Sequence, residues 1–134
     1  MKLAGLTVAY WAVLVAALLP IGCAWLAKSG QMTRPRREGG LDNQHPREWL
    51  ARQTDWRARA NAAQANSFEA LPLFIGAVII AHQLGASQVR VDVLAFLFVV
   101  LRVLYIMMYV ANMANARSLV WAAALLVNIA ILFV

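Results

Sequence analysis

Four long apolar segments alternate with short polar ones along the 134 residues of the chain. The apolar stretch at 3–27 exceeds the ~20 residues that a helix needs to cross a bilayer, and Pro20 is expected to kink it. The remaining pattern predicts three more helices, at about 47–84, 90–112 and 118–134. We therefore predict an all-α protein of one domain over residues 1–134, an integral membrane four-helix bundle with left-handed up-down topology.

The first apolar segment has a second interpretation. Lys2 precedes it, and residues 20–23 loosely resemble the cleavage box of a lipoprotein signal peptide. However, the run is longer than the ~7–15 residues of a typical signal core, and Pro20 stands where such a box has an aliphatic residue. A spanning helix is favoured, with Cys23 as a small buried packing residue.

Composition turns a helical pattern into a prediction of a membrane protein. Hydrophobic residues make up 63% of the chain and charged residues 13%, against ~45–50% and ~25% in soluble domains. These values exclude a disordered chain, an ordinary soluble enzyme and a nucleic-acid-binding domain. One cysteine and no Cys/His cluster exclude a disulfide framework and a zinc site within the chain. We therefore expect membrane lipids as surroundings, no nucleic acid and no metal.

The net charge of +6 is concentrated in one region. Eight of the twelve Lys and Arg residues lie between positions 28 and 59: Lys28, Arg34, Arg36, Arg37, Arg47, Arg52, Arg57 and Arg59. The positive-inside rule places the polar loop at about 28–46, and the basic segment as far as residue 55, in the cytoplasm. Both termini and the 85–90 turn are then outside a bacterial inner membrane, and the 112–117 turn is inside.

Two charged side chains, Glu69 and Arg102, fall inside apolar spans. At ~1.5 Å per residue, both lie roughly 15–20 Å from the cytoplasmic side. Because either charge alone is costly in hydrocarbon, we predict that Glu69 and Arg102 form a buried ion pair. Two interpretations stay open: the pair only holds two helices together, or it forms the floor of a binding site.

Other polar positions align with these charges. Tyr105 and Tyr109 follow Arg102 at i+3 and i+7, so the three form one stripe on a helix face. Asn66 and Glu69 share a face of the second predicted helix. For the tyrosines the alternative is aromatic packing with satisfied polar tips, and for Asn66 and Glu69 it is hydrogen bonding between spans. Both alternatives stay open, although the alignment with Arg102 distinguishes the tyrosines from ordinary packing residues.

The last predicted helix begins at Arg117-Ser118. A helix N-terminus stabilises negative charge and Arg is a permanent cation, so this end is a candidate anion or thiolate site. The alternative is a snorkelling Arg beside an N-cap Ser. Trp121 follows one turn later. His45 and His82 have no carboxylate or Cys at ligand spacing, and we assign them no metal role.

The stretch 59–74 resembles the signature of the MAPEG family, the membrane-associated proteins of eicosanoid and glutathione metabolism. It matches the pattern R-A-x-x-A-x-x-N-x-x-E-x-x-P-x-F. Three further segments resemble other parts of the family: Asn43-x-x-Pro46-Arg47, Arg102-x-x-Tyr105-x-x-x-Tyr109 and Arg117-Ser118-x-x-Trp121. The resemblance covers nearly the whole chain and is to a bacterial-type member.

This resemblance implies a homotrimer, with glutathione bound between neighbouring subunits near the cytoplasmic side. It implies that Asn66 and Glu69 hold the polar ends of the tripeptide and that Arg102 supports Glu69. It also implies that Arg117 faces the thiol and favours its thiolate, while Ser118 donates a hydrogen bond to it. The residues expected to bind the cofactor are Arg59, Asn66, Glu69, Arg102, Tyr105, Tyr109 and Trp121.

Two functions remain open. The first is a glutathione-dependent transferase or peroxidase that acts on lipophilic electrophiles from the bilayer. The second is a non-catalytic membrane binding or scaffold protein of the same fold. Ala62 and Ala65 stand where well-characterised members of the family carry an Arg, and Trp121 replaces a Tyr and cannot accept a hydrogen bond. An enzyme would need Arg117 at the thiol, whereas a scaffold would not.

Overall fold

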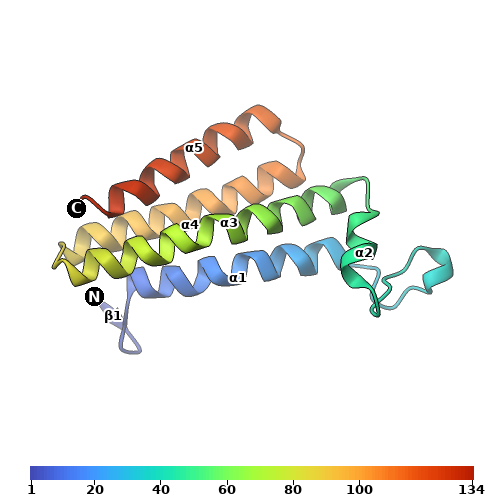
Figure 1. Cartoon of the computed structure of the whole chain (residues 1–134), viewed down its shortest axis with the longest axis horizontal. Coiled ribbons are helices and arrows are strands. Elements are labelled where there is room, and N and C mark those ends of the chain that lie inside the picture. The colour runs from blue at the N-terminus through green and yellow to red at the C-terminus, as the bar shows by residue number, and fades with distance from the viewer.

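The four apolar stretches form four long helices in the computed structural model, which describes all 134 residues (Figure 1). They are α1 (Val8–Lys28), α3 (Trp56–Gln83), α4 (Gln88–Val110) and α5 (Ala114–Ile131). Each is long and apolar enough to cross a membrane. Successive helices run in opposite directions, so both termini lie at one end of the bundle and the loop after α1 lies at the other (Figure 1). The predicted up-down four-helix fold is confirmed.

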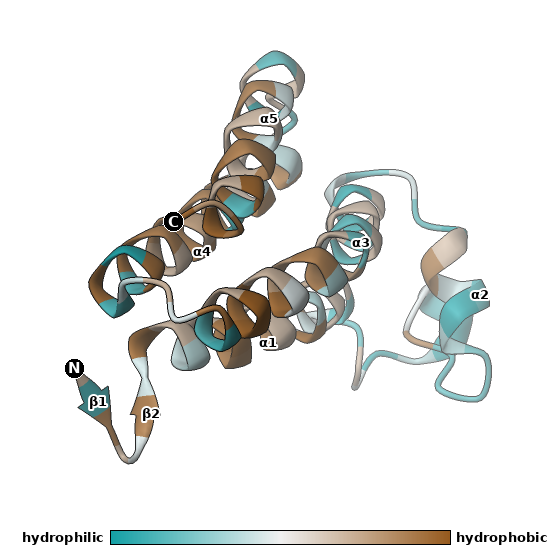
Figure 2. Cartoon of the chain, turned by 60° about the vertical axis from the view of Figure 1, so that its left-hand side comes forward, coloured by the Kyte–Doolittle hydropathy of each residue, from teal (hydrophilic) through white to brown (hydrophobic).

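Hydrophobic residues make up most of the four long helices, as the brown ribbon in Figure 2 shows, and many of their side chains are exposed on the outside of the chain. Leu18, Phe96 and Leu126 are examples that are exposed on the chain. The interior is built largely from small residues: Ala9, Ala12, Ala16, Ala77, Ala81, Ala95 and Ala124. Small residues let helix backbones approach closely, which suits packing in lipid, where apolar burial between helices gives no driving force. The chain is an integral membrane protein.

The predicted start of the first helix at residue 3 is wrong. Lys2–Leu3 (β1) and Leu6–Thr7 (β2) pair as a short antiparallel hairpin instead. Gly5, with φ of 82°, takes the left-handed conformation that the hairpin turn requires. The Thr7 hydroxyl then accepts a hydrogen bond from the Tyr10 N–H at 3.2 Å and caps α1. Local turn and cap chemistry therefore overrides the apolar pattern at this end.

The predicted helix at 47–84 is two helices. A short α2 (Pro46–Ala51) lies across the end of the bundle, and α3 begins only at Trp56 (Figure 1). The break occurs because the Asp55 carboxylate accepts the N–H of Arg57 at 3.1 Å and so starts a new helix. The loop before α2 also contains one turn of 3₁₀ helix, η1 (Arg36–Glu38).

Two arginines in the first turn of α3 hold the neighbouring helices at this end. Arg57 donates from Nη1 to the carbonyls of Ala27 at 2.9 Å and Ser29 at 2.6 Å, at the end of α1. Arg59 donates from Nε to the carbonyl of Val110 at 3.0 Å, at the end of α4. Because the last carbonyls of a helix lack intrahelical partners, these cations satisfy them and complement the negative end of each helix dipole.

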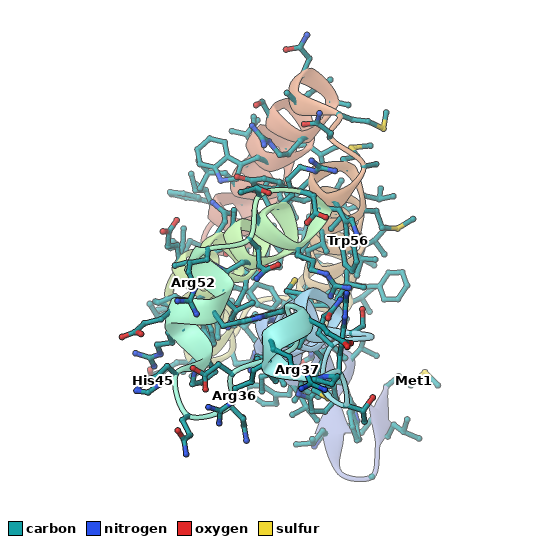
Figure 3. All side chains as sticks on the ribbon, turned by 90° about the vertical axis from the view of Figure 1, so that its right-hand side faces the viewer. Met1, Arg36, Arg37, His45, Arg52 and Trp56 are labelled. Carbon is teal, nitrogen blue, oxygen red and sulfur yellow. The ribbon has the colours of Figure 1, made fainter.

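The loop between α1 and α2, residues 29–45, is called the basic loop below. It lies at the end of the bundle that faces the viewer in Figure 3, where Arg36, Arg37 and His45 of the loop and the nearby Arg52 are labelled. Within this loop Asp42 lies 3.6 Å from the Arg36 guanidinium and 3.3 Å from the His45 ring. Desolvation raises the pKa of Asp42, but the N–H of Gln44 and the side chains of His45 and Arg36 more than offset it, so the pKa is lowered. The loop is thus locally ordered by its own charges.

The last predicted helix at 118–134 begins about one turn earlier. Asn112, with φ of 61°, reverses the chain after α4, and Met113 occupies the N-cap position of α5. The interpretation of Ser118 as an N-cap is therefore wrong. Arg117, whose N–H donates to the Met113 carbonyl at 2.9 Å, completes the first turn of the helix. It remains close to the positive end of the helix dipole.

At the opposite end, a carboxylate of α4 caps α1. Asp92 accepts a hydrogen bond from the Ala9 N–H at 2.8 Å and another from the Gln88 side-chain amide at 2.7 Å.

We expect Asp92→Ala to lower the free energy of unfolding in detergent by about 1 kcal/mol, because an N–H in the first turn of α1 loses its acceptor. Gln88→Ala leaves the Asp92–Ala9 bond intact and should cost less. Equal stability of Asp92→Ala and the wild type in chemical denaturation would contradict this cap.

Candidate functional site

Arg102, midway along α4, is a buried cation without an anionic partner. Arg102 is only 3% exposed to solvent. Nη2 donates to Asn66 Oδ1 at 2.8 Å and to Ser67 Oγ at 3.5 Å, both on α3. The guanidinium carbon lies 4.3 Å from the centre of the Tyr105 ring. The only ion pairs in the chain are those of Asp42 in the loop, so no carboxylate neutralises Arg102.

The predicted direct ion pair between Glu69 and Arg102 is therefore wrong. Asn66 stands between them, because its Oδ1 accepts from Arg102 while its Nδ2 donates to Glu69 Oε2 at 3.5 Å. Equal depth along two helices does not determine the direction in which a side chain points. Here α3 presents Asn66 and Ser67 to α4, and Glu69, one turn further on, is exposed on this chain.

Arg102 begins a row of four side chains in contact, which we call the cation–tyrosine wall: Arg102, Tyr105, Tyr109 and Arg117. The rings of Tyr105 and Tyr109 meet edge to face, with centroids 5.7 Å apart. The Arg117 guanidinium carbon lies 4.2 Å from the centre of the Tyr109 ring. Cations over aromatic faces are attracted by the ring quadrupole. The wall therefore holds two permanent cations in defined positions, one at each end.

Two adjoining cavities lie along this wall, between α3, α4 and α5. The deep cavity has a volume of about 170 Å³, and its lining includes Asn66, Glu69, Arg102, Trp121 and Asn128. The shallow cavity has a volume of about 220 Å³ and is lined by Asn66, Tyr105, Tyr109, Arg117, Ser118 and Trp121. Asn66 and Trp121 contribute to both cavities. The two spaces together form one polar site within an apolar bundle.

All the residues that the sequence marks as site candidates line one of these cavities, except Arg59. Arg59 is committed to the carbonyl of Val110 at the end of α4, where it serves the fold. The predicted stripe of Arg102, Tyr105 and Tyr109 is confirmed as a geometric feature, because each side chain contacts the next. Arg117 joins that stack from α5, which spacing within one helix did not indicate.

One polar residue that lines the cavities was not singled out from the sequence. Asn128 of α5 is 2% exposed and lines the deep cavity. The signal was present, since Asn128 is the single amide in the apolar run after Ser118. Polar groups within a spanning helix almost always face the protein interior or a cavity.

Four spanning helices around a buried cation and two cavities define an integral membrane protein with polar groups inside its bundle. The family model described as MAPEG family matches residues 8–134. The chain therefore belongs to the MAPEG family, and the resemblance of 59–74 to its signature is confirmed. Comparison with curated proteins and with solved structures gives no match.

The bond between Asn66 and Arg102 should be visible as an energetic coupling. Hydrogen bonds to charged groups contribute about 1.5–3 kcal/mol, so we expect Asn66→Leu and Arg102→Met to be non-additive by an amount of that order. The measurement is a double-mutant cycle on the free energy of unfolding in detergent. The matched cycle of Glu69→Gln with Arg102→Met should give a smaller coupling. A larger coupling at Glu69 would restore the direct ion pair.

Proposed function

We propose that this protein binds glutathione in the two cavities and uses its thiolate to attack lipophilic electrophiles, as a transferase or peroxidase. The observation that carries the proposal is the buried guanidinium of Arg102, which has no counterion and faces a cavity. Family membership supports the same ligand, because the family is generally related to glutathione.

Arg102 is suited to a ligand carboxylate. A guanidinium has five N–H donors, and only Nη2 of Arg102 is used by the protein. An unpaired charge at this depth is unfavourable, and a carboxylate supplies both the missing negative charge and strong hydrogen-bond acceptors. Glutathione carries a carboxylate at each end of the tripeptide, so one of them can neutralise Arg102.

Arg117 is suited to the sulfur. It stands in the first turn of α5 and lines the shallow cavity together with Ser118. Both the cation and the helix N-terminus lower the pKa of a nearby thiol, and the thiolate is the reactive nucleophile. In a transfer reaction the sulfur lone pair forms the new bond to the electrophilic carbon, and the electrons of the broken bond leave with the departing group. The thiol proton is released when glutathione binds.

The electrophile has a route from the bilayer. Trp121, which lines both cavities, is 42% exposed on this chain. An apolar molecule dissolved in lipid can therefore approach the sulfur beside this ring without crossing the aqueous phase. The transferred group is accordingly expected to be lipophilic.

A non-catalytic binding or scaffold role is the second candidate, and the position of two alanines favours it. Ala62 and Ala65, which replace a family Arg, line a separate hollow between α2 and α3 together with Asn61 and Gln64. Neither lines the deep or the shallow cavity, and an alanine cannot supply the carboxylate clamp that the resemblance assigns to an Arg here. Glutathione binding decides between the two candidates.

That same hollow supports assembly as a homotrimer. Asn61 and Gln64 face away from the other three long helices of their own chain. Amides on a spanning helix require protein or water beside them, and a neighbouring subunit supplies both contact and partners. Glutathione would then lie between neighbouring subunits, where the exposed Glu69 would be covered.

A thiolate should form when glutathione binds. A thiolate absorbs in the ultraviolet where the thiol does not, so a difference spectrum of the detergent-purified protein with millimolar glutathione reports it directly. We expect a thiolate band with the wild type and none with Arg117→Ala, because the cation next to the sulfur is removed. Arg117→Lys should keep part of the band, since Lys retains the charge but loses the planar fork.

Calorimetry on the same samples measures glutathione binding separately from thiolate formation. An undiminished band with Arg117→Ala would show that Arg117 does not face the sulfur. Failure of the wild type to bind glutathione at millimolar concentration would reject the enzyme and favour the scaffold.

We propose that the end of the bundle that carries the loop and α2 is cytoplasmic and that both termini face outside, because eight of the twelve Lys and Arg residues lie at positions 28–59. Cys23 is buried, so a cysteine introduced by Arg37→Cys is the accessible one. In intact cells it should resist a membrane-impermeant thiol reagent and react only after lysis.

The mass of the protein in mild detergent should correspond to three chains. Labelling from outside would reverse the topology, and a monomeric mass would reject the trimer.

A further inference from the structure

Asn128 is a buried amide that the fold itself does not use. It is 2% exposed on the face of α5 that lines the deep cavity. Its Oδ1 has no hydrogen-bond partner in the protein. A buried polar group left unpaired destabilises a fold, and in native proteins such a group calls for an explanation. Because Asn128 lines the deep cavity, a ligand in that cavity could supply the missing partner.

The groups around the deep cavity define what the ligand offers. The amide of Asn66 is already engaged, with Oδ1 bonded to Arg102 and Nδ2 to Glu69. The groups still free to bind are the Arg102 guanidinium as donor, the Glu69 carboxylate as acceptor, and the Asn128 carbonyl oxygen as acceptor. One cation and two acceptors around a small space complement an α-amino-acid head group, in which a carboxylate and an ammonium lie on one carbon.

We propose that Asn128 accepts a hydrogen bond from the ammonium of the γ-glutamyl head group of glutathione. This inference rests on the proposed function, and it gives the tripeptide a direction within the site. The γ-glutamyl carboxylate binds Arg102, and the ammonium lies between Glu69 and Asn128. The chain then passes Asn66 and Trp121, which line both cavities, and the sulfur reaches Arg117.

The remainder of the deep cavity agrees with this direction. Beyond the polar groups its lining is apolar and includes Leu73, Phe98 and Ala124. The second carboxylate of glutathione, on its glycyl residue, therefore has no partner in the apolar part of the deep cavity. The glycyl carboxylate must lie on the other side of the sulfur, toward the basic loop, where positive potential is concentrated.

The test uses two probes and two variants in calorimetry on the purified full chain. The probes are glutathione and glutaryl-cysteinyl-glycine, which differs only in having hydrogen in place of the ammonium. The wild type should prefer glutathione. Asn128→Leu should bind glutathione about tenfold more weakly and the analogue almost unchanged, because a bond to a charged donor is lost. Asn115→Leu removes an amide from an exposed position of the same helix and should bind both probes as the wild type does.

Thermal unfolding of the ligand-free protein separates a binding role from a structural one. Because Asn128 has an unsatisfied oxygen, Asn128→Leu should unfold at the same temperature as the wild type or higher. Asn128→Ala, which introduces no new bulk, should show the same loss of preference for the ammonium. A lower melting temperature, with an unchanged preference for glutathione over the analogue in both variants, would mean that Asn128 has a structural role. That outcome would overturn this inference and leave the proposed function standing. If the wild type binds neither probe, the proposed function fails together with it.

Discussion

The guanidinium of Arg102 is the constraint on which the site depends, because a permanent cation at membrane depth must be surrounded by polar groups. Its hydrogen bonds require Asn66 and Ser67 of α3 to face α4, and its stacking requires Tyr105 to lie one turn further along the same helix. Asn66 then reaches back to Glu69. A single side chain thus determines how far α3 and α4 are shifted along each other and how they are rotated about their axes. None of these partners is anionic, so the protein keeps a net positive charge in its interior, available to a ligand.

The packing of the helices explains why there is space beside that charge. Alanines at the contacts of α1, α3 and α4 allow these helices to approach closely. The last helix, α5, packs mainly against α4 and makes little contact with α3, and it runs at an angle to the rest of the bundle (Figure 1). The two cavities occupy the space that remains between α3 and α5, over α4. The small residues and the tilt of α5 therefore shape the site as much as its polar residues do.

For the proposed ligand, binding and stability are opposed at this site. Arg102 without a counterion and Asn128 without a hydrogen-bond partner both weaken the ligand-free fold. A ligand that satisfies both gains binding free energy from that deficit, and by linkage it stabilises the folded chain. The tyrosines of the cation–tyrosine wall limit the cost, because their ring faces attract Arg102 and Arg117 without neutralising them. Both cations are thus in place before the proposed anionic ligand binds.

The sequence by itself determined the four spans, the family through the 59–74 signature, and the face shared by Arg102, Tyr105 and Tyr109, because hydropathy and helical periodicity report length, depth and side. It did not reveal the hairpin before Val8 or the helix start at Asp55, since a single turn or cap residue decides each of these against the apolar pattern. Only the tertiary structure decided that Asn66 and not Glu69 bonds Arg102, that Arg59 caps α4, and that Asn128 faces a cavity. The reason is physical. Periodicity gives the direction of a side chain relative to its own helix axis, whereas its partner depends on how far each helix is rotated and tilted against its neighbours.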